Sequence, residues 1–343
     1  MRCINEKKRM TKRRAVFRTS RRMACFACVV FLMAAFLGGC GSQSYTMAYQ
    51  ADYDVSTFNM VSRQERRTAV PFATNLCVAT TDLTDDERVD MSQAKAAGLF
   101  RLEDNTVLYA KNVHERLHPA SITKVMTALV ALENGTLNQV LTATDAVKIT
   151  ESGAVLCGLE PGDTMTLDQA LRILLVWSAN DVGMLIAENI GGSVEHFLEM
   201  MNAKARELGA TNTNFTNPHG LTDINHYTTA YDLYLIFNEA IKNDTFNEII
   251  HMSGYQTVFY DKNGGEKSFD KPSTNQFLRG NYQPPANITV IGGKTGTTNE
   301  AGHCLMLFTR DENGSPYISI ILGAQSRDVN YNEMIDLLDE IHK

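Results

Sequence analysis

The stretch His118–Leu129, HPASITKVMTAL, places a serine three residues before a lysine at the start of an apolar run. Positions i and i+3 share one face of a helix, so the Ser121 hydroxyl and the Lys124 amine can meet. An amine beside a hydroxyl can take its proton and leave it ready to attack. The plain alternative is two polar residues on a solvated helix turn. The surrounding sequence has to distinguish these two interpretations.

Apolar patterns on both sides of this stretch predict the fold. Two short apolar runs within 96–112 flank a polar turn and predict a hairpin. Helices are predicted at 119–134, at 167–177 after a capping box of Thr166 and Gln169, at 181–190, at 193–208 and, with Thr229 as its cap, at 229–242. Strand patterns then follow residue 253 (YQTVFY, ITVIGG, HCLMLFTR and YISIILGAQ), before a last helix at 330–343. This order predicts an α+β domain. Its antiparallel sheet is built from both ends of the domain and flanked by helices, with a mainly helical second lobe at about 136–250.

The serine–lysine spacing occurs three times, so context has to select among the copies. The pair Ser92/Lys95 runs directly into a predicted strand. The pair Ser268/Lys271 precedes a proline in what reads as a polar loop. Only Ser121/Lys124 begins a long amphipathic helix, which makes it the candidate pair.

Two further polar motifs follow in the chain. Ser178-Ala179-Asn180 interrupts a helical pattern, where polar side chains can project into a cleft. Ser273-Thr274-Asn275 has the same spacing and is interpreted as a polar cluster in a loop. Lys294-Thr295-Gly296 occurs once in the chain, directly after a strand-like run, and is the sharper signal.

Serine-x-x-lysine, serine-x-asparagine and lysine-threonine-glycine, in this order, resemble the penicillin-interacting serine acyl-transferases. The segments VWSANDVG, TNPHGL, YTTAYDL and GGKTGTTNEAGHCL, with the run 96–135, resemble the serine-type D-alanyl-D-alanine carboxypeptidases in particular. The resemblance extends from about residue 95 to the C-terminus. It implies a β-lactamase/transpeptidase-like fold, a peptidoglycan pentapeptide stem as substrate, β-lactam antibiotics as covalent inhibitors, and no metal or organic cofactor.

The chemistry and the resemblance together assign roles to the first two motifs. Ser121 would attack the substrate and form an acyl-enzyme. Lys124 can act as the base only as a neutral amine, so burial and a nearby second cation, Lys294, have to lower its pKa. Ser178 would relay a proton to the departing amine. Asn180 would bind the substrate backbone and orient Lys124.

The third motif would bind the end of the substrate. Lys294 and Thr295 would hold the terminal carboxylate and so select a free C-terminal D-alanine. Gly296 would let the strand approach the substrate closely. By the resemblance, the backbone N–H groups of Ser121 and Thr297 would face the developing oxyanion. His219 lies in a turn-like Asn-Pro-His-Gly run and is predicted to be structural rather than catalytic.

Three other functions share these motifs. A class A-like β-lactamase would add a Glu-x-x-Leu-Asn element, which does not occur between Asp181 and Lys294. A non-hydrolytic penicillin-sensing or penicillin-binding lipoprotein would acylate and stay acylated. Transpeptidation would use the same acyl-enzyme with an amine acceptor, and the sequence leaves it open.

The N-terminus predicts export. Residues 1–23 carry ten Lys and Arg and one acidic residue, a net charge of +9 against −7 for the whole chain, so the remainder carries about −16. The net negative charge of the residues after 23 argues against a nucleic-acid partner. The apolar run that follows predicts a signal peptide at 1–39, and Leu37–Cys40 resembles a lipobox.

Cys40 would then be the lipidated first residue of the mature protein. A lipidated N-terminus and flexible tether would occupy 40–74, and the catalytic domain 75–343. The protein would therefore be extracytoplasmic and anchored to the bacterial cell membrane by its N-terminal lipid. The last helix has an acidic face, unsuited to an anionic membrane. Cys77, Cys157 and Cys304 have wide spacings that indicate no disulfide framework or zinc site.

Overall fold

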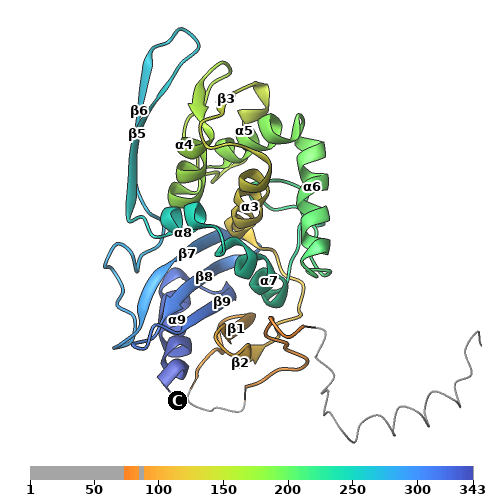
Figure 1. Cartoon of the computed structure of the whole chain (residues 1–343), viewed down its shortest axis with the longest axis vertical. Helices are drawn as coiled ribbons and strands as arrows, with labels where there is room; N and C mark the ends of the chain where they lie inside the picture. The colour runs from red at the N-terminus through yellow and green to blue at the C-terminus, as the bar shows by residue number, and fades with distance from the viewer. Residues whose placement is uncertain (1–72, 85–88, 343) are drawn as a thin grey trace, which may run out of the picture. The chain divides into compact units, whose positions relative to one another are not determined.

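A computed structural model describes residues 73–84 and 89–342, and within these residues the chain forms two antiparallel sheets and the helices between them (Figure 1). The larger sheet has the strand order β2-β1-β9-β8-β7, and the smaller one β3-β4-β5-β6. The predicted signal peptide at 1–39 and nearly all of the predicted tether, including Cys40, lie outside the described residues. No helix in the described ranges is long and apolar enough to span a membrane.

The larger sheet joins the two ends of the domain, as predicted. Its strands are β1 (Ala96–Arg101), β2 (Thr106–Lys111), β7 (Thr289–Thr298), β8 (Gly302–Arg310) and β9 (Pro316–Ala324). Strand β1 pairs antiparallel with β9, with Leu99 opposite Ser319, so the N-terminal hairpin lies beside the last strand of the chain. The α+β fold built from both ends is therefore confirmed.

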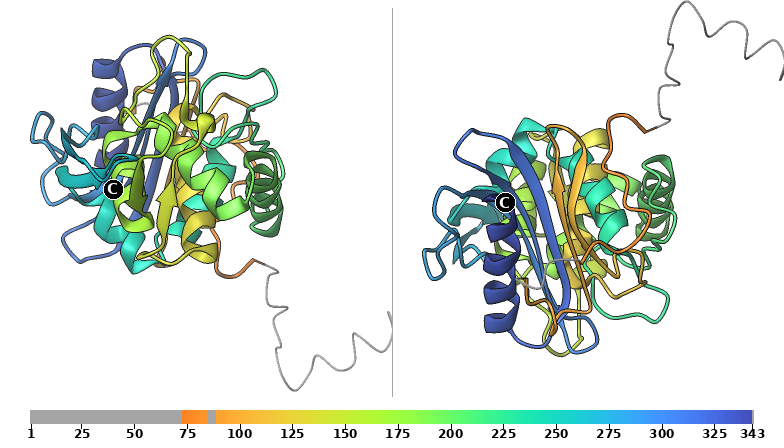
Figure 2. Two further views of the ribbon diagram at one scale, coloured as in Figure 1. Left: turned by 90° about the horizontal axis from the view of Figure 1, so that it is seen from above. Right: turned by 90° about the horizontal axis from the view of Figure 1, so that it is seen from below.

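Helices cover both faces of this sheet. Helix α9 (Arg327–Asp339) packs Met334 and Leu337 against one face, together with Leu99 and Leu305. In both views of Figure 2 this blue helix lies on one side of the sheet and the yellow-green helices lie on the other. The helix begins three residues before the predicted 330, because the Ser326 hydroxyl caps it by accepting from the N–H of Val329.

The remaining helices lie on the opposite face. They are the 3₁₀ turn η1 (Ala120–Thr123), α3 (Lys124–Asn134), η2 (Asp145–Val147), α4 (Leu167–Arg172), the π-helical turn η3 (Ile173–Trp177), α5 (Asn180–Gly191), α6 (Val194–Glu207), α7 (Ala230–Ala240) and α8 (Asp244–Ile250). The capping box at Thr166 and the hydroxyl cap at Thr229 are present as predicted. Helix α8 was not predicted. A 3₁₀ turn, η4 (Glu340–His342), follows α9.

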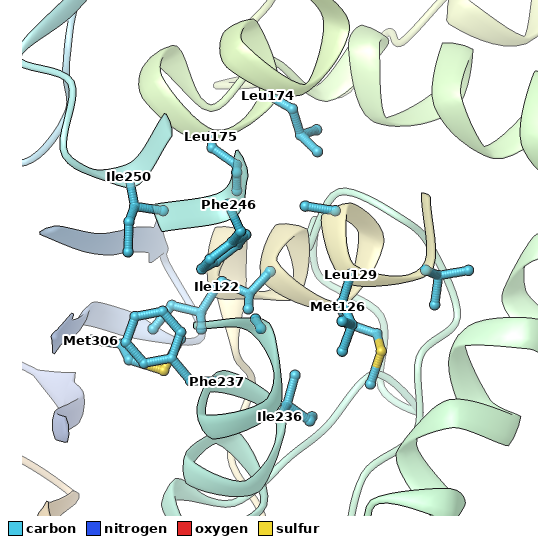
Figure 3. Packing of buried hydrophobic residues seen from close by; sticks show 14 of the residues in the cluster. Ile122, Met126, Leu129, Leu174, Leu175, Ile236, Phe237, Phe246, Ile250 and Met306 are labelled. Atoms are coloured by element: carbon cyan, nitrogen blue, oxygen red, sulfur yellow. The ribbon is translucent and has the colours of Figure 1, made fainter. Parts of the chain in front are cut away.

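Helix α3 lies at the centre of the core rather than at its edge. Its first eight residues are all buried, so the expected amphipathic helix is in fact enclosed on every side. Figure 3 shows Ile122, Met126 and Leu129 surrounded by side chains from η3, α7, α8 and β8. A polar side chain on this helix is therefore enclosed by protein, and this burial governs the chemistry of Lys124.

The second sheet was not predicted as a separate unit. It consists of β3 (Val140–Thr142), β4 (Thr164–Thr166), β5 (Gly254–Tyr260) and β6 (Glu266–Pro272). The prediction of a polar loop at Ser268–Lys271 is wrong, since both residues lie in β6. Only Phe269 of this strand is buried, so its sequence carries little apolar signal.

The division between sheet and helices is less sharp than the predicted helical lobe at about 136–250 suggests. That range also contains β3 and β4. Helix α7 lies within it, but its Tyr234 ring stacks on Phe100 of β1 with the centroids 4.3 Å apart. The helical segment thus packs directly on the larger sheet.

Candidate active site

The backbone immediately before Ser121 is held in an unusual conformation. Ala120 has a φ of +47°, which costs energy for a residue with a side chain. Its carbonyl accepts from Thr123 Oγ1 at 2.8 Å, and that hydroxyl lies 2.8 Å from Nε2 of the buried His226. Gly220 passes so close that a Cβ on it would lie 1.9 Å from the Ala120 oxygen. These contacts fix the direction in which Ser121 points.

Lys124 lies fully buried one turn after Ser121. Its Nζ is 2.9 Å from Ser121 Oγ, 2.6 Å from Asn180 Oδ1 and 2.5 Å from the carbonyl oxygen of His219. Burial, and secondarily the charge of Lys294, lower the pKa of Lys124 well below its usual value, while Asp181 acts weakly in the opposite sense. Burial therefore favours the neutral amine form of Lys124 over the ammonium.

The three contacts of this amine dictate where its lone pair points. A neutral amine has two N–H donors and one lone pair. The oxygens of Asn180 and His219 can only accept, so they take the two N–H groups. The lone pair is left facing Ser121, whose O–H can donate to it. The site thus holds a base aimed at a hydroxyl.

Lys294 lies in β7 and is also fully buried. Its Nζ donates to Ser178 Oγ and to the Thr295 carbonyl, each at 2.9 Å. Burial lowers the pKa of Lys294 to about 7. Within the described part of the chain, neither Lys124 nor Lys294 forms an ion pair. Two buried amines without a counter-ion disfavour each other's charge, so the site carries less than two positive charges.

The loop between η3 and α5 contacts both lysines. The π-helical turn ends at Ser178, which has a φ of +74°, and α5 begins at Asn180. Such turns are frequent at functional sites because they rotate the following residues out of helical register. Ser178 consequently faces Lys294, and Asn180 faces Lys124. The predicted interruption of the helix is confirmed.

Asp181, which the sequence analysis did not single out, anchors this loop. Its buried carboxylate accepts from the N–H groups of Cys157, Gly158 and Leu159 at 2.8–3.1 Å. The N–H of Asn180 donates to Val155 on the same segment at 2.7 Å. A carboxylate with this many backbone donors is rigid, so the neighbouring Asn180 is held in place.

Strand β7 lies directly against the turn that carries the serine. A Cβ on Gly296 would lie 3.0 Å from the Pro119 oxygen and from the Ser121 nitrogen, so glycine lets the strand approach this closely without displacing its neighbours. Thr295 Oγ1 donates to Thr274 Oγ1 at 2.7 Å. Thr274 belongs to the Ser273-Thr274-Asn275 cluster, which is therefore not confined to its loop.

The structure brings most of the predicted site residues together. Ser121, Lys124 and Asn180 form one hydrogen-bonded group, and Ser178 and Lys294 form a second beside it. The Thr297 side chain is exposed and contacts His303 Nδ1 at 3.2 Å, so only its backbone can face the serine.

His219 contributes to the site through its backbone. Its carbonyl holds Lys124, while its ring Nδ1 accepts from the N–H of Leu221. Burial, with a smaller effect of Lys124, lowers the pKa of the ring to about 3. Burial likewise lowers the pKa of His226 to about 4. Both rings are neutral and structural.

Cys77, Cys157 and Cys304 are free thiols. No group of three metal-ligating side chains occurs in the ranges 73–84 and 89–342.

Comparison with known proteins matches these features to one family. Residues 84–326 match the sequence profile of peptidase family S11, D-alanyl-D-alanine carboxypeptidase. The chain is 36% identical over 254 residues to D-alanyl-D-alanine carboxypeptidase DacF of Bacillus subtilis, covering 71% of this chain and 61% of that protein. It is 30% identical to DacC of Escherichia coli K12, covering 71% and 60%. The chain thus spans about three fifths of the length of these two curated relatives.

A solved structure agrees with the sequence comparison. The fold superposes on the Streptomyces K15 DD-transpeptidase with a TM-score of 0.67 and 27% identity, covering 72% of this chain and 96% of that one. The curated sequence from Streptomyces K15 is named D-alanyl-D-alanine carboxypeptidase and is 28% identical, covering 77% of this chain and 93% of that one. The sequence profile, the relatives and the fold agree: this chain belongs to the D-alanyl-D-alanine carboxypeptidase family, peptidase family S11.

Proposed function

We propose that the chain is a serine-type D-alanyl-D-alanine carboxypeptidase that removes the terminal D-alanine from peptidoglycan stem peptides through a Ser121 acyl-enzyme. The observation that carries the proposal is the buried amine of Lys124, which lies 2.9 Å from the Ser121 hydroxyl and whose pKa is lowered by that burial. Family membership supplies the substrate class, since the curated relatives are named for this activity. The same acyl-enzyme chemistry would let β-lactam antibiotics acylate Ser121.

The acylation step follows from the contacts. Lys124 takes the proton of Ser121 as Oγ attacks the carbonyl carbon of the penultimate D-alanine, a general-base contribution of about 10²–10⁴-fold. The backbone N–H groups of Ser121 and Thr297 stabilise the oxyanion, and the close packing of Gly296 on the Ser121 nitrogen supports this geometry. The amide bond then breaks as the leaving nitrogen receives a proton from Ser178.

The second lysine serves the leaving group. Ser178 regains its proton from Lys294, which donates to it at 2.9 Å and has a pKa of about 7. Lys294 and Thr295 bind the terminal carboxylate of the substrate. Asn180 has an amide nitrogen free to hydrogen-bond the substrate backbone while its Oδ1 holds Lys124. Water then attacks the acyl-enzyme and the ester bond breaks. Lys124 returns its proton to Ser121 Oγ, and the proton that the water loses restores Lys294.

Transpeptidation is the second candidate, because the similar Streptomyces K15 protein is named both as a DD-transpeptidase and as a carboxypeptidase. The two activities share every step up to the acyl-enzyme. They differ in whether water or an amine accepts the acyl group. A β-lactamase or a non-hydrolytic penicillin sensor would instead be separated by the fate of a penicillin adduct.

A fluorescent penicillin and a diacetyl-Lys-D-Ala-D-Ala peptide test the proposal together. The wild type should label covalently and release free D-alanine, and Ser121→Ala should do neither. Label without release would indicate the sensor, rapid loss of label the β-lactamase, and a product extended by an added amino acid the transpeptidase. Failure of the wild type to label would overturn the acyl-enzyme itself.

We also propose that the protein is an extracytoplasmic lipoprotein, held on the membrane by a lipid on Cys40. The basic 1–23 segment, the apolar run and the Leu37–Cys40 sequence support this location. Two acyl chains on one cysteine suffice for stable anchoring. Globomycin-sensitive processing, and release of Cys40→Ser from the membrane fraction, are the expected results. Unchanged membrane association of Cys40→Ser would contradict the anchor.

A further inference from the structure

A surface pocket of about 270 Å³ lies beside the candidate active site. Its wall includes Arg116 and His118, which precede Ser121 by five and three residues, and Glu300, which follows the end of β7. Leu117, Ile224 and Tyr227 give it apolar surface. Neither the proposed acylation nor the leaving-group chemistry uses any of these side chains.

Arg116 is held in place without an acidic partner from the part of the chain that the structure describes. Its Nε and Nη2 donate to Asn212 Oδ1 at 3.3 and 3.0 Å, and its guanidinium lies over the Tyr227 ring at 4.8 Å from the centroid. Lys95 lines the same pocket. Among the residues that the structure describes, neither cation forms an ion pair. A fixed, unpaired guanidinium is preorganised to bind a carboxylate.

Glu300 is already engaged. Its Oε2 accepts from the Thr222 hydroxyl at 2.8 Å, and that hydroxyl also contacts Thr298 at the end of β7. Counting Lys95, Arg116 and Glu300, the pocket keeps one net positive charge although the chain as a whole carries −7. A positive pocket on an acidic protein favours an anionic group.

The position of the pocket indicates which part of the substrate reaches it. On the proposed function, the leaving D-alanine lies at Lys294 and Thr295, and the scissile carbonyl lies at Thr297. The acyl-donor peptide must therefore continue past Thr298 towards Glu300. An extended chain advances about 3.3 Å per residue, so these positions lie no more than about 10 Å beyond the carbonyl. A long side chain one residue before the two D-alanines can span this distance.

We infer that this pocket is a subsite for a carboxylate borne on the side chain of the residue that precedes the D-alanyl-D-alanine pair, bound by Arg116 and Lys95. The inference rests on the proposed function and adds a substrate preference to it. Arg116 takes no part in the bond breaking of the proposed mechanism. It acts by selecting the acyl donor.

Three peptides that differ at one position test the inference. They are Nα,Nε-diacetyl-Lys-D-Ala-D-Ala, its analogue with a carboxylate added at the ε carbon (diacetyl-diaminopimelyl-D-Ala-D-Ala), and the carboxamide of that analogue. We expect the wild type to prefer the carboxylate peptide over the other two by about fivefold in kcat/KM, because an exposed ion pair supplies a modest gain. The preference should shrink as ionic strength rises.

The Arg116→Gln variant should bring the carboxylate-to-carboxamide ratio close to one. Both kcat/KM values are measured on one preparation of the variant. A lower fraction of folded enzyme reduces both values equally and leaves their ratio unchanged. Arg310→Gln is the matched control, because Arg310 also donates to an oxygen and lies 5.6 Å from a ring, at the far end of β8. It should keep the wild-type ratio.

Failure of the subsite and failure of the proposed function give different results. Release of D-alanine at equal rates from all three peptides, or an unchanged ratio in Arg116→Gln, would overturn the subsite alone. Equal rates for the carboxylate and carboxamide peptides would show that the pocket recognises the size of the group rather than its charge. That result would also overturn the subsite. No release from any peptide would overturn the proposed function, and the subsite with it.

Discussion

Two regions of this molecule withdraw lysine side chains from solvent, and they do so in opposite ways: Lys124 and Lys294 are fully buried, and Lys267 is partly buried. At the candidate active site, Lys124 and Lys294 are enclosed with hydroxyl, amide and carbonyl oxygens, and neither has a carboxylate partner among the described residues. Near the turn of the β5–β6 hairpin, Lys267 is 2.6 Å from the buried carboxylate of Asp163 and also donates to the Gly158 carbonyl. The active site disfavours the ammonium form of its lysines, whereas the Asp163 carboxylate compensates the positive charge of Lys267.

This difference shows which kind of lysine can act as a base. A paired lysine stays charged and holds two segments together. An unpaired buried lysine gives up its proton and becomes a base, at a cost in stability. The predictions below separate these two cases, from the largest expected effect to the smallest.

Lys124→Arg should abolish acylation as fully as Lys124→Ala. Arginine keeps much of the length but is always charged and cannot be deprotonated in a protein, so no lone pair faces Ser121. The second-order rate of penicillin acylation should fall by about 10³-fold or more in both variants. A nearly active Lys124→Arg enzyme would show that charge, rather than basicity, is what the site uses.

Asp181→Asn should slow acylation by about 10–100-fold, because it loosens the loop that holds Asn180. It also removes the negative charge that raises the pKa of Lys124. The pKa of Lys124 should then fall further, and the acid limb of the acylation rate should move to lower pH. Slower acylation with an unmoved acid limb would mean that Asp181 acts on structure alone.

Lys294→Met should raise the melting temperature while acylation and turnover are lost. Removing an unpaired buried amine relieves a penalty of about 1–2 kcal/mol after its two hydrogen bonds are counted, roughly 3–6 °C. The folded lysine loses its proton above about pH 7, whereas the unfolded one keeps it to about 10.4.

The pH dependence of this gain has a definite sign. Between those two values the unfolded wild type binds more protons, so raising the pH stabilises the wild type. The advantage of Lys294→Met in melting temperature should therefore shrink from pH 7 to pH 10. A constant or growing advantage would contradict the lowered pKa of Lys294.

Lys267→Met should have the opposite effect on stability. It leaves the Asp163 carboxylate, which is 3% exposed, without its cation. Lys267 itself is 31% exposed, so the loss is moderate, about 1–2 kcal/mol. Lys242→Met is the matched control, since the pair it forms with Glu239 lies on the surface and its removal should change stability by less than about 0.5 kcal/mol. Thermal melts of the three lysine-to-methionine variants would decide whether pairing accounts for the contrast.

Local chemistry explains the part of the fold that the sequence predicted. The hydroxyl caps at Thr166 and Thr229 act within one turn of their helices, so three-residue spacings revealed them. The strands at both ends have continuous apolar runs because helices cover both faces of their sheet. The three motifs were visible because serine, lysine and asparagine side chains carry the chemistry.

Features that depend on distant contacts were missed. Strand β6 is mostly exposed, so its polar sequence reads as a loop. The burial of α3 on every side depends on α7 and α8, which are distant in sequence. The His219 carbonyl is a backbone group and leaves no mark in the sequence, and Thr274 became part of the site only through its contact with Thr295.

The central claim is that Lys124 is an amine, not an ammonium, in the resting enzyme. NMR of ¹⁵N-labelled lysine side chains, with Lys124 assigned through Lys124→Ala, measures its protonation directly. The account predicts an Nζ chemical shift typical of a neutral amine at pH 7, and a titration only in acid. An ammonium shift at pH 7 that titrates near the ordinary lysine value would contradict it.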